Sequence, residues 1–553
     1  MRESASKRLA ISAVLVAALL FSLPFAAAAD ARTTRVLIGY DPTNASAVER
    51  LVQSVGGRIV FQYTIVSALA ADVPSRSVKM ISTNSAVAYA EADAARYVSS
   101  HILPLQPWTG SPEILPWGVE KVRANEVWDA NDNLAVDANA VAGQGVKVAV
   151  LDTGVDLTHP DLVGNLVPLS AYCAGGDICD FIDMDSNPSD TPGEFQGHGS
   201  SASGNIAAVD NRIGVIGVAP KAKILMYRVC DALEGICPTS AIIAGINEAV
   251  EDDARIISMS FGGPASVHTE RVAISNAFNE GLLLVASSGN EGRPPVGFPA
   301  ALPEVIAVGA TDITDTIADF SSFGFDQELV APGVDVPTTT VQGVGREALF
   351  SVVSGLAPTG GRQTNPLEFS ALGSIVNKKM RYVGLGTASE VATECTVANP
   401  CAGHLALIKR GDISFQEKVA NAAAAGLAGA VIFNNLPGNF FGTLQATSTI
   451  PAGSISLEDG EPIRVAIQGG ASVFGSLVVV SSAYDSVSGT SFSCPYVSAV
   501  AALVWSKNPG LTNAEVRAIL QGTAIDLGAS GYDTTYGFGR VDALAAVAAT
   551  PAP

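Results

Sequence analysis

Three short motifs that lie far apart in this chain contain an acid, a base and a hydroxyl. Asp152 follows a run of β-forming residues at 146–151, His198 is followed by small residues, and Ser491 lies among glycine, threonine and serine. Serine is a weak nucleophile at neutral pH, so acyl transfer needs an imidazole to take its proton and a carboxylate to orient that imidazole. The three residue types together predict nucleophilic attack on a carbonyl group.

The order of these residues along the chain separates the known classes of serine hydrolase. The order Asp152, His198, Ser491 differs from the Ser, Asp, His order of α/β-hydrolases and the His, Asp, Ser order of chymotrypsin-like enzymes. The segments 148–156 and 488–495 resemble those around the acid and the nucleophile of subtilisin-like serine proteases. The resemblance implies an endopeptidase that acts on proteins or peptides and requires no cofactor for catalysis.

Further site residues follow from the same resemblance. Asn290 resembles the asparagine whose amide donates to the tetrahedral oxyanion. Two uncharged segments match those that pair with the substrate backbone and line the specificity pocket, which favours apolar or aromatic side chains before the cleaved bond. The residues expected to contact substrate are Ser260, Phe261, Gly262, Gly263, Ser287, Ser288 and Gly289.

Two other functions compete with this interpretation. An α/β-hydrolase esterase is disfavoured because Ser493 stands where the motif Gly-x-Ser-x-Gly requires its second glycine. A catalytically silent binding protein stays open, because residues 200–201 are both serine where the family has threonine and histidine, and Tyr496 replaces another family histidine. Neither change removes a member of the triad.

Strands alternate with helices from about residue 117, which predicts an α/β fold with a mostly parallel sheet covered by helices on both faces. Asn290 and Ser491 are 201 residues apart, which indicates an inserted domain. Residues 403–435 resemble the β-rich α/β protease-associated (PA) domain, for which a lid or protein-binding role is expected; a passive spacer is the alternative. The expected organisation is a signal peptide (1–29), an inhibitory propeptide (30–105), a first part of the protease domain (106–348), the PA-like insertion (349–482) and a second part of the protease domain (483–553).

The small α+β unit near the N-terminus is expected to contain strands at 34–40, 59–71 and 86–92 and a helix at 46–55. It resembles the inhibitory propeptide of subtilisin-like enzymes, whose C-terminal tail runs through the active cleft until self-cleavage. The resemblance implies a zymogen with its own propeptide as inhibitor. A domain that stays attached is the alternative.

The N-terminus has the pattern of an export signal. Basic residues precede an apolar run at 9–25, and four alanines end at Ala29, where cleavage is expected. The chain is therefore expected to be secreted, into the medium or the periplasm, without stable membrane association; an uncleaved anchor is the alternative. The net charge of −21 argues against a nucleic-acid partner.

Seven cysteines fit an exported chain. Six of them form three pairs at short spacing, which predicts three local disulfides and leaves Cys494 over. The predicted pairs are Cys173 with Cys179, Cys230 with Cys237, and Cys395 with Cys401.

Five aspartates, Asp177, Asp180, Asp183, Asp185 and Asp190, crowd the loop before His198. Their oxygens could hold a structural calcium ion, with Asp183, Asp185 and Asp190 as the candidate ligands, which would relieve the repulsion of the carboxylates. A solvated acidic loop is the alternative.

Overall fold

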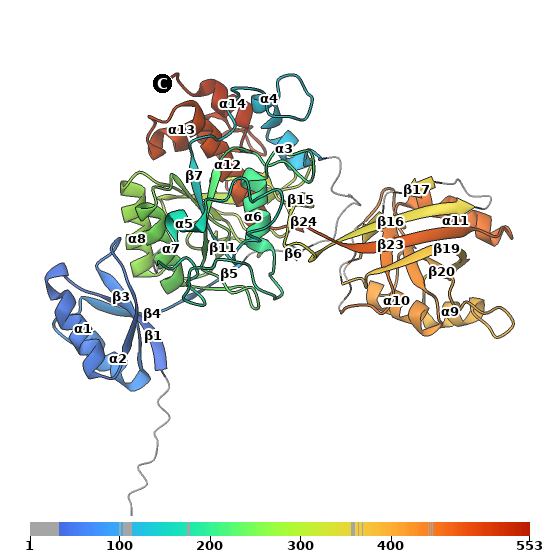
Figure 1. The fold of residues 1–553 in the computed structure, drawn as a ribbon, viewed down its shortest axis with the longest axis horizontal. Coiled ribbons are helices and arrows are strands. Elements are labelled where there is room, and N and C mark those ends of the chain that lie inside the picture. Colours follow the sequence, from blue (N-terminus) through green and yellow to red (C-terminus); the bar gives the residue numbers. More distant parts are fainter. Residues whose placement is uncertain are drawn as a thin grey trace, which may run out of the picture.

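The computed structural model describes residues 33–98, 101–102, 113–173, 177–354, 360–362, 364–367, 369–440, 442, 444 and 446–553. The predicted signal peptide lies outside the described residues. Figure 1 shows three units: a small N-terminal unit beside helices α7 and α8, a central α/β unit, and an inserted unit on the opposite side.

The N-terminal unit is a four-stranded antiparallel sheet in the order β2-β3-β1-β4, with two helices. The single strand expected at 59–71 is wrong: the chain turns at 63–67, and β2 and β3 pair as a hairpin. The turn is held from outside, because the backbone N–H groups of Thr64 and Ile65 donate to Asn247 Oδ1 in the central unit. The elements are β1 (Thr33–Gly39), α1 (Ala45–Ser54), β2 (Arg58–Gln62), β3 (Ala68–Pro74), α2 (Val78–Ser82) and β4 (Tyr89–Ala92).

The central unit is built on a six-stranded parallel sheet in the order β14-β13-β12-β10-β7-β8. Along β7, Val148 and Val150 belong to one buried cluster while Ala149 and Leu151 belong to another, so both faces of the sheet are covered. This confirms the predicted α/β fold. The strands are β7 (Lys147–Asp152), β8 (Lys223–Arg228), β10 (Ile256–Met259), β12 (Leu283–Ser287), β13 (Val305–Thr311) and β14 (Leu329–Pro332).

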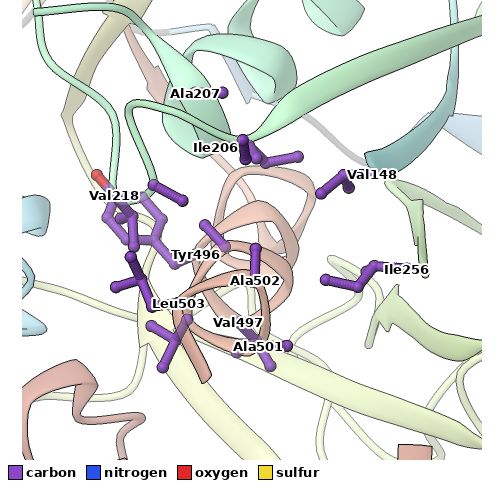
Figure 2. Packing of buried hydrophobic residues seen from close by; sticks show 14 of the residues in the cluster. Val148, Ile206, Ala207, Val218, Ile256, Tyr496, Val497, Ala501, Ala502 and Leu503 are labelled. Carbon is purple, nitrogen blue, oxygen red and sulfur yellow. The ribbon is translucent and has the colours of Figure 1, made fainter. Parts of the chain in front are cut away.

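Helix α12 (Thr490–Lys507) passes through the middle of this core. Residues 490–505 are all buried, and side chains from β7, β10 and α6 surround the helix (Figure 2). A helix that is apolar on every side is stable only where protein surrounds it. The other helices are α3 (Trp117–Lys121), α4 (Asn125–Trp128), α5 (Leu169–Tyr172), α6 (His198–Ala207), α7 (Thr239–Glu251), α8 (His268–Asn279), α13 (Asn513–Thr523) and α14 (Ala543–Ala549).

Short strands complete the edge of the central unit. β5 (Ala95–Val98) lies between β9 (Ile236–Pro238) and β11 (Phe261–Gly262), and β24 (Tyr484–Ser488) lies between β15 (Val336–Thr339) and β6 (His101–Ile102). The chain leaves the parallel sheet at Ser260, between β10 and β11. Both three-stranded groups are antiparallel.

The inserted unit leaves the central unit after β15 and returns before β24. Its eight-stranded mixed sheet has the order β17-β16-β23-β19-β20-β21-β22-β18, and neighbouring residues of β20 belong to two different buried clusters. Its elements are β16 (Gly345–Ser354), β17 (Gly360–Arg362), β18 (Thr364–Pro366), β19 (Gly373–Tyr382), α9 (Ala388–Glu394), β20 (Leu405–Lys409), α10 (Phe415–Ala424), β21 (Gly429–Phe433), β22 (Ala452–Ile455), α11 (Leu457–Gln468) and β23 (Phe474–Ser482).

The three predicted disulfides are present, and Cys494 is a free, buried cysteine. Among the described residues, none of the helices combines the length and apolar character required to cross a bilayer.

Cys494 is expected to be chemically silent in the folded protein. Its side chain is fully buried, and burial raises the pKa of the thiol to about 11, so little thiolate exists at neutral pH. Ellman's reagent at pH 8 should detect no thiol in the native protein and one per chain in denaturant. A rapid native reaction would contradict this placement.

Candidate active site

Asp152 and His198 meet where a strand ends and a helix begins. Asp152 is the last residue of β7 and His198 the first of α6, and His198 Nδ1 lies 2.6 Å from Asp152 Oδ1. The backbone N–H of Thr153 also donates to that carboxylate oxygen, at 2.7 Å. A Cβ on Gly199 would lie 2.1 Å from the carbonyl oxygen of Gly154, so only glycine allows this approach of helix and strand.

Ser491 lies in the first turn of α12, which begins one residue earlier. Its hydroxyl donates to the carbonyl oxygen of Ser260 at 2.7 Å, and the hydroxyl of Ser260 donates in turn to the carbonyl oxygen of Ser491. Pro495, which lies inside the helix, has no N–H to donate to that oxygen. Ser260 thus replaces the missing helical hydrogen bond and fixes the start of α12.

The imidazole of His198 is oriented towards α12. Its Nε2 atom is buried and has no hydrogen-bond partner within the described residues, and its ring packs on Phe492 with 5.0 Å between ring centres. The side-chain amide of Asn205 donates to the carbonyl oxygen of Phe492, which ties α6 to α12. His198 therefore bonds the carboxylate through Nδ1 and keeps Nε2 available next to the segment that carries Ser491.

The side-chain amide of Asn290 is held beside the start of α12. Its Oδ1 accepts hydrogen bonds from the backbone N–H and the hydroxyl of Thr490, at 3.0 and 2.9 Å. Because Oδ1 faces a backbone donor, Nδ2 must point away from it, and this nitrogen is buried and unpaired in the described part of the chain. Asn290 is bonded to Thr490, the residue before Ser491. A buried donor without a partner at this position suits a developing oxyanion.

The two segments predicted to contact substrate lie next to each other. Gly263 exchanges two backbone hydrogen bonds with Phe298, and Gly297 donates to the carbonyl oxygen of Ser288. The hydroxyl of Ser287 donates to the carbonyl oxygen of Phe261 at 3.4 Å. The cleft edge is already occupied by another strand: Phe261 pairs with Val98 and Gly262 with Tyr97 of β5.

The two departures from the family pattern are accommodated separately. Ser201 donates to the carbonyl oxygens of Gly197 and Thr339, so its hydroxyl is satisfied within the protein. Tyr496 is fully buried, and its ring lies against Gly118, where a Cβ would come 2.3 Å from the phenol oxygen. Neither residue contacts the reacting groups of the triad.

The acidic loop is organised around an arginine. Arg228, at the end of β8, makes ion pairs with Asp180 and Asp183. Asp185 caps a local turn by accepting from the N–H of Asn187. Asp190 is turned inward and accepts from the N–H of Gly197 at 2.6 Å. Within the described residues, which include the whole of 177–190, no three His, Cys, Asp or Glu side chains are placed to hold a metal ion, so the proposed calcium ligands do not converge.

Asp190 is a part of the site whose role the sequence did not indicate. Its carboxylate joins the residue before His198 to Thr153, the residue after Asp152, whose hydroxyl lies 3.4 Å away. Burial raises the pKa of Asp190 to about 8, and the charge of Asp152 acts in the same direction.

This pKa predicts a stability change with pH. The pKa of Asp190 in the folded state lies above its unfolded value of about 4, so its contribution to stability is present below about pH 4 and is lost as the pH rises through about 8. Asp190→Asn keeps an acceptor for Gly197 and cannot ionise. In a Ser491→Ala background, urea unfolding at pH 5 to 9 should show the parent losing at least about 1 kcal/mol relative to the variant. Parallel stability curves would contradict the assignment.

Comparisons with known proteins agree with this geometry. A model of the subtilase family matches residues 143–361 and 463–539, and a PA domain model matches residues 373–463. Subtilisin NAT of Bacillus subtilis subsp. natto is 31% identical over 350 residues, which are 60% of this chain and 82% of that protein. The major intracellular serine protease of Bacillus subtilis (strain 168) is 39% identical over 230 residues, 41% of this chain and 66% of that one.

Solved structures are also similar. The psychrophilic subtilisin-like protease Apa1 from the Antarctic psychrotroph Pseudoalteromonas sp. AS-11 has a TM-score of 0.57 and 27% identity, covering 80% of this chain and all of that one. Fervidolysin from Fervidobacterium pennivorans, at 20% identity and the same TM-score, shares the fold over 94% of this chain and 62% of its own. The chain therefore belongs to the subtilase family and is a subtilisin-like serine endopeptidase with an inserted PA domain.

Proposed function

We propose that this chain is a secreted, self-processing endopeptidase in which Asp152, His198 and Ser491 form the catalytic triad. The 2.6 Å contact between His198 Nδ1 and Asp152 is the observation that carries the proposal, because it fixes Nδ1 as the donor and leaves Nε2 as the base. Rotation of the Ser491 side chain away from the carbonyl oxygen of Ser260 directs its hydroxyl to Nε2. Catalytic hydrogen bonds often tighten only when substrate is bound.

The reaction then proceeds in two steps. Ser491 Oγ bonds to the carbonyl carbon of the peptide while His198 Nε2 takes its proton, and Asn290 Nδ2 with backbone amides stabilises the oxyanion. The C–N bond breaks as His198 returns the proton to the leaving amine. Water hydrolyses the resulting ester by the same proton transfers, so the chemistry requires no cofactor.

The N-terminal unit acts as an inhibitory propeptide in this proposal. It contributes carboxylates to the N-termini of two helices of the protease: Asp93 accepts from the N–H and hydroxyl of Ser240 in α7, and Glu91 accepts from the N–H of Thr269 in α8. Such caps satisfy unpaired backbone donors, and their negative charge interacts favourably with the helix dipole. The strand β5, which follows this unit in the chain, pairs with the edge strand β11 that a substrate would use.

The N-terminal segment also borders Ser491 from both sides. Val98 pairs with Phe261, next to the residue whose carbonyl oxygen holds Ser491, and His101 pairs with Ser488, three residues before Ser491. These two pairings support a maturation cut between Val98 and His101, a few residues before the boundary at residue 105 expected from the sequence. Three disulfides support maturation in an oxidising compartment, as secretion requires.

The test compares the wild type with Ser491→Ala. The wild type should react with a fluorophosphonate probe and, by N-terminal sequencing, begin at residue 99, 100 or 101. Ser491→Ala should not react and should retain the N-terminal unit. A folded wild type that neither reacts nor matures would instead favour a catalytically silent binding protein.

A further inference from the structure

Arg96 and Glu270 form a fully buried ion pair between the N-terminal segment and the protease. Both side chains are 0% exposed. Arg96 Nε donates to Glu270 Oε1 at 3.2 Å, and Arg96 Nη2 donates to Oε2, so the guanidinium and the carboxylate meet through two parallel hydrogen bonds. This bidentate geometry is specific to arginine, because lysine offers a single point charge.

In the proposed maturation, Arg96 is removed with the N-terminal segment, whereas Glu270 stays in the protease. Arg96 belongs to β5, which lies in the cleft, and Glu270 lies in the first turn of α8, which is part of the protease itself. The walls around the guanidinium also come from the protease. A Cβ on Gly263 would lie 3.1 Å from Arg96 Nη1, so the backbone at Gly263 forms one side of a pocket that a larger residue would close. Glu270 lies at the end of that pocket.

Buried and exposed side chains alternate along β5, and the buried ones contact the protease. Arg96 and Val98 point inward and are buried, while Tyr97 is 50% exposed. Because the register brackets the cut between Val98 and His101, Arg96 lies three to five residues before the cleaved bond. An inward-pointing residue at this distance is where a protease that binds extended peptides can select its substrates.

Removal of the N-terminal unit would leave Glu270 without its partner. Burial raises the pKa of Glu270, and the charge of Arg96 opposes that rise. Ionising a carboxyl group that is buried away from water is unfavourable when it has no partner. A guanidinium that enters the pocket offsets this desolvation penalty. The pocket therefore discriminates by charge as well as by shape.

We propose that Glu270 forms a guanidinium-binding pocket in the substrate cleft, and that the enzyme prefers peptides with arginine at the place that Arg96 occupies. The proposal rests on the proposed function, because it treats the N-terminal segment as the first substrate. It changes the apolar preference expected from residues 260–263 and 287–289, since Glu270 lies outside both segments. A purely structural ion pair that only fastens the N-terminal unit is the competing explanation.

The test uses the mature wild-type enzyme and two internally quenched peptides. One has the sequence of residues 94–103 of this chain, and the other differs only by leucine in place of Arg96. The arginine peptide should show a kcat/KM at least about 10-fold higher. Mass spectrometry should place the cut between Val98 and His101. Equal values for the two peptides, or a cut elsewhere in the sequence, would overturn the proposal without any variant.

Variants then assign the preference to Glu270. Glu270→Gln should bring the ratio of the two kcat/KM values close to one, and Glu270→Leu should invert it. Glu270→Leu alone would leave Arg96 buried without its partner and hinder maturation. This variant is therefore combined with Arg96→Leu, so that an apolar pair fills the space. Glu280→Gln, which removes an exposed carboxylate just beyond the other end of α8, is the matched control and should keep the wild-type ratio.

Each rate is divided by the concentration of active sites titrated with a fluorophosphonate, so a poorly folded variant does not mimic a change in selectivity. An arginine preference that survives in Glu270→Leu would assign selection to another residue and overturn the proposal. Failure of the wild type to react with the fluorophosphonate is a different result, since it would contradict the proposed function and not the pocket.

Discussion

Replacing His198 with alanine is expected to lower kcat by about 10⁶-fold, the magnitude measured for subtilisin. The physical reason is that, in the proposed triad, Nε2 of His198 is the base for Ser491, and Asp152 holds the imidazole in a defined tautomer through the 2.6 Å contact at Nδ1. Without it the hydroxyl of Ser491 keeps its proton at neutral pH. The variant should therefore also retain its N-terminal unit.

The measurement needs mature protein, which this variant cannot produce by itself. A trace of wild type can remove the N-terminal unit and is then inactivated with a fluorophosphonate before peptide hydrolysis is recorded. His404→Ala, a histidine change in the inserted unit, is the control and should mature and cleave normally. A loss of less than about 10²-fold in His198→Ala would show that another group acts as the base.

Replacing Asn290 with alanine is expected to lower kcat by about 10²- to 10³-fold while KM changes little, again the magnitude measured for subtilisin. The amide nitrogen of Asn290 has no partner within the described residues and its oxygen is fixed by Thr490, so the donor is positioned before the reaction begins. In the proposed oxyanion role its hydrogen bond strengthens only as the oxyanion forms, so the loss is expected in kcat.

A matched variant tests the orientation of this amide. Thr490→Val removes the hydroxyl that donates to Asn290 Oδ1 but keeps the backbone N–H, so the amide is held by one hydrogen bond where it had two. Its loss in kcat should be clearly smaller than that of Asn290→Ala. Equal losses would mean that Thr490 acts directly on the reaction. A change in KM in place of a fall in kcat would argue against an oxyanion role for Asn290.

Motifs around the reacting residues were predictable because each is local. Asp152 follows a run of β-forming residues, and in the structure it is the last residue of β7. The hairpin of β2 and β3 was not predictable, because the turn at 63–67 depends on Asn247 in another unit. The break between β10 and β11 at Ser260 was not predictable either, because Ser260 contacts Ser491, which lies 231 residues later.

By itself the sequence indicated the class of chemistry, the parallel α/β architecture and the cysteine pairs, because short motifs, the alternation of strand and helix patterns and the close spacing of the cysteines carry these signals. Only the tertiary structure decided that Asp190 turns inward beside the triad, that Arg228 gathers the acidic loop, and that Arg96 enters the protease at Glu270. The physical reason is that a charged side chain looks the same in sequence whether water or a distant partner surrounds it. Its burial and its pKa depend on residues that folding alone brings near.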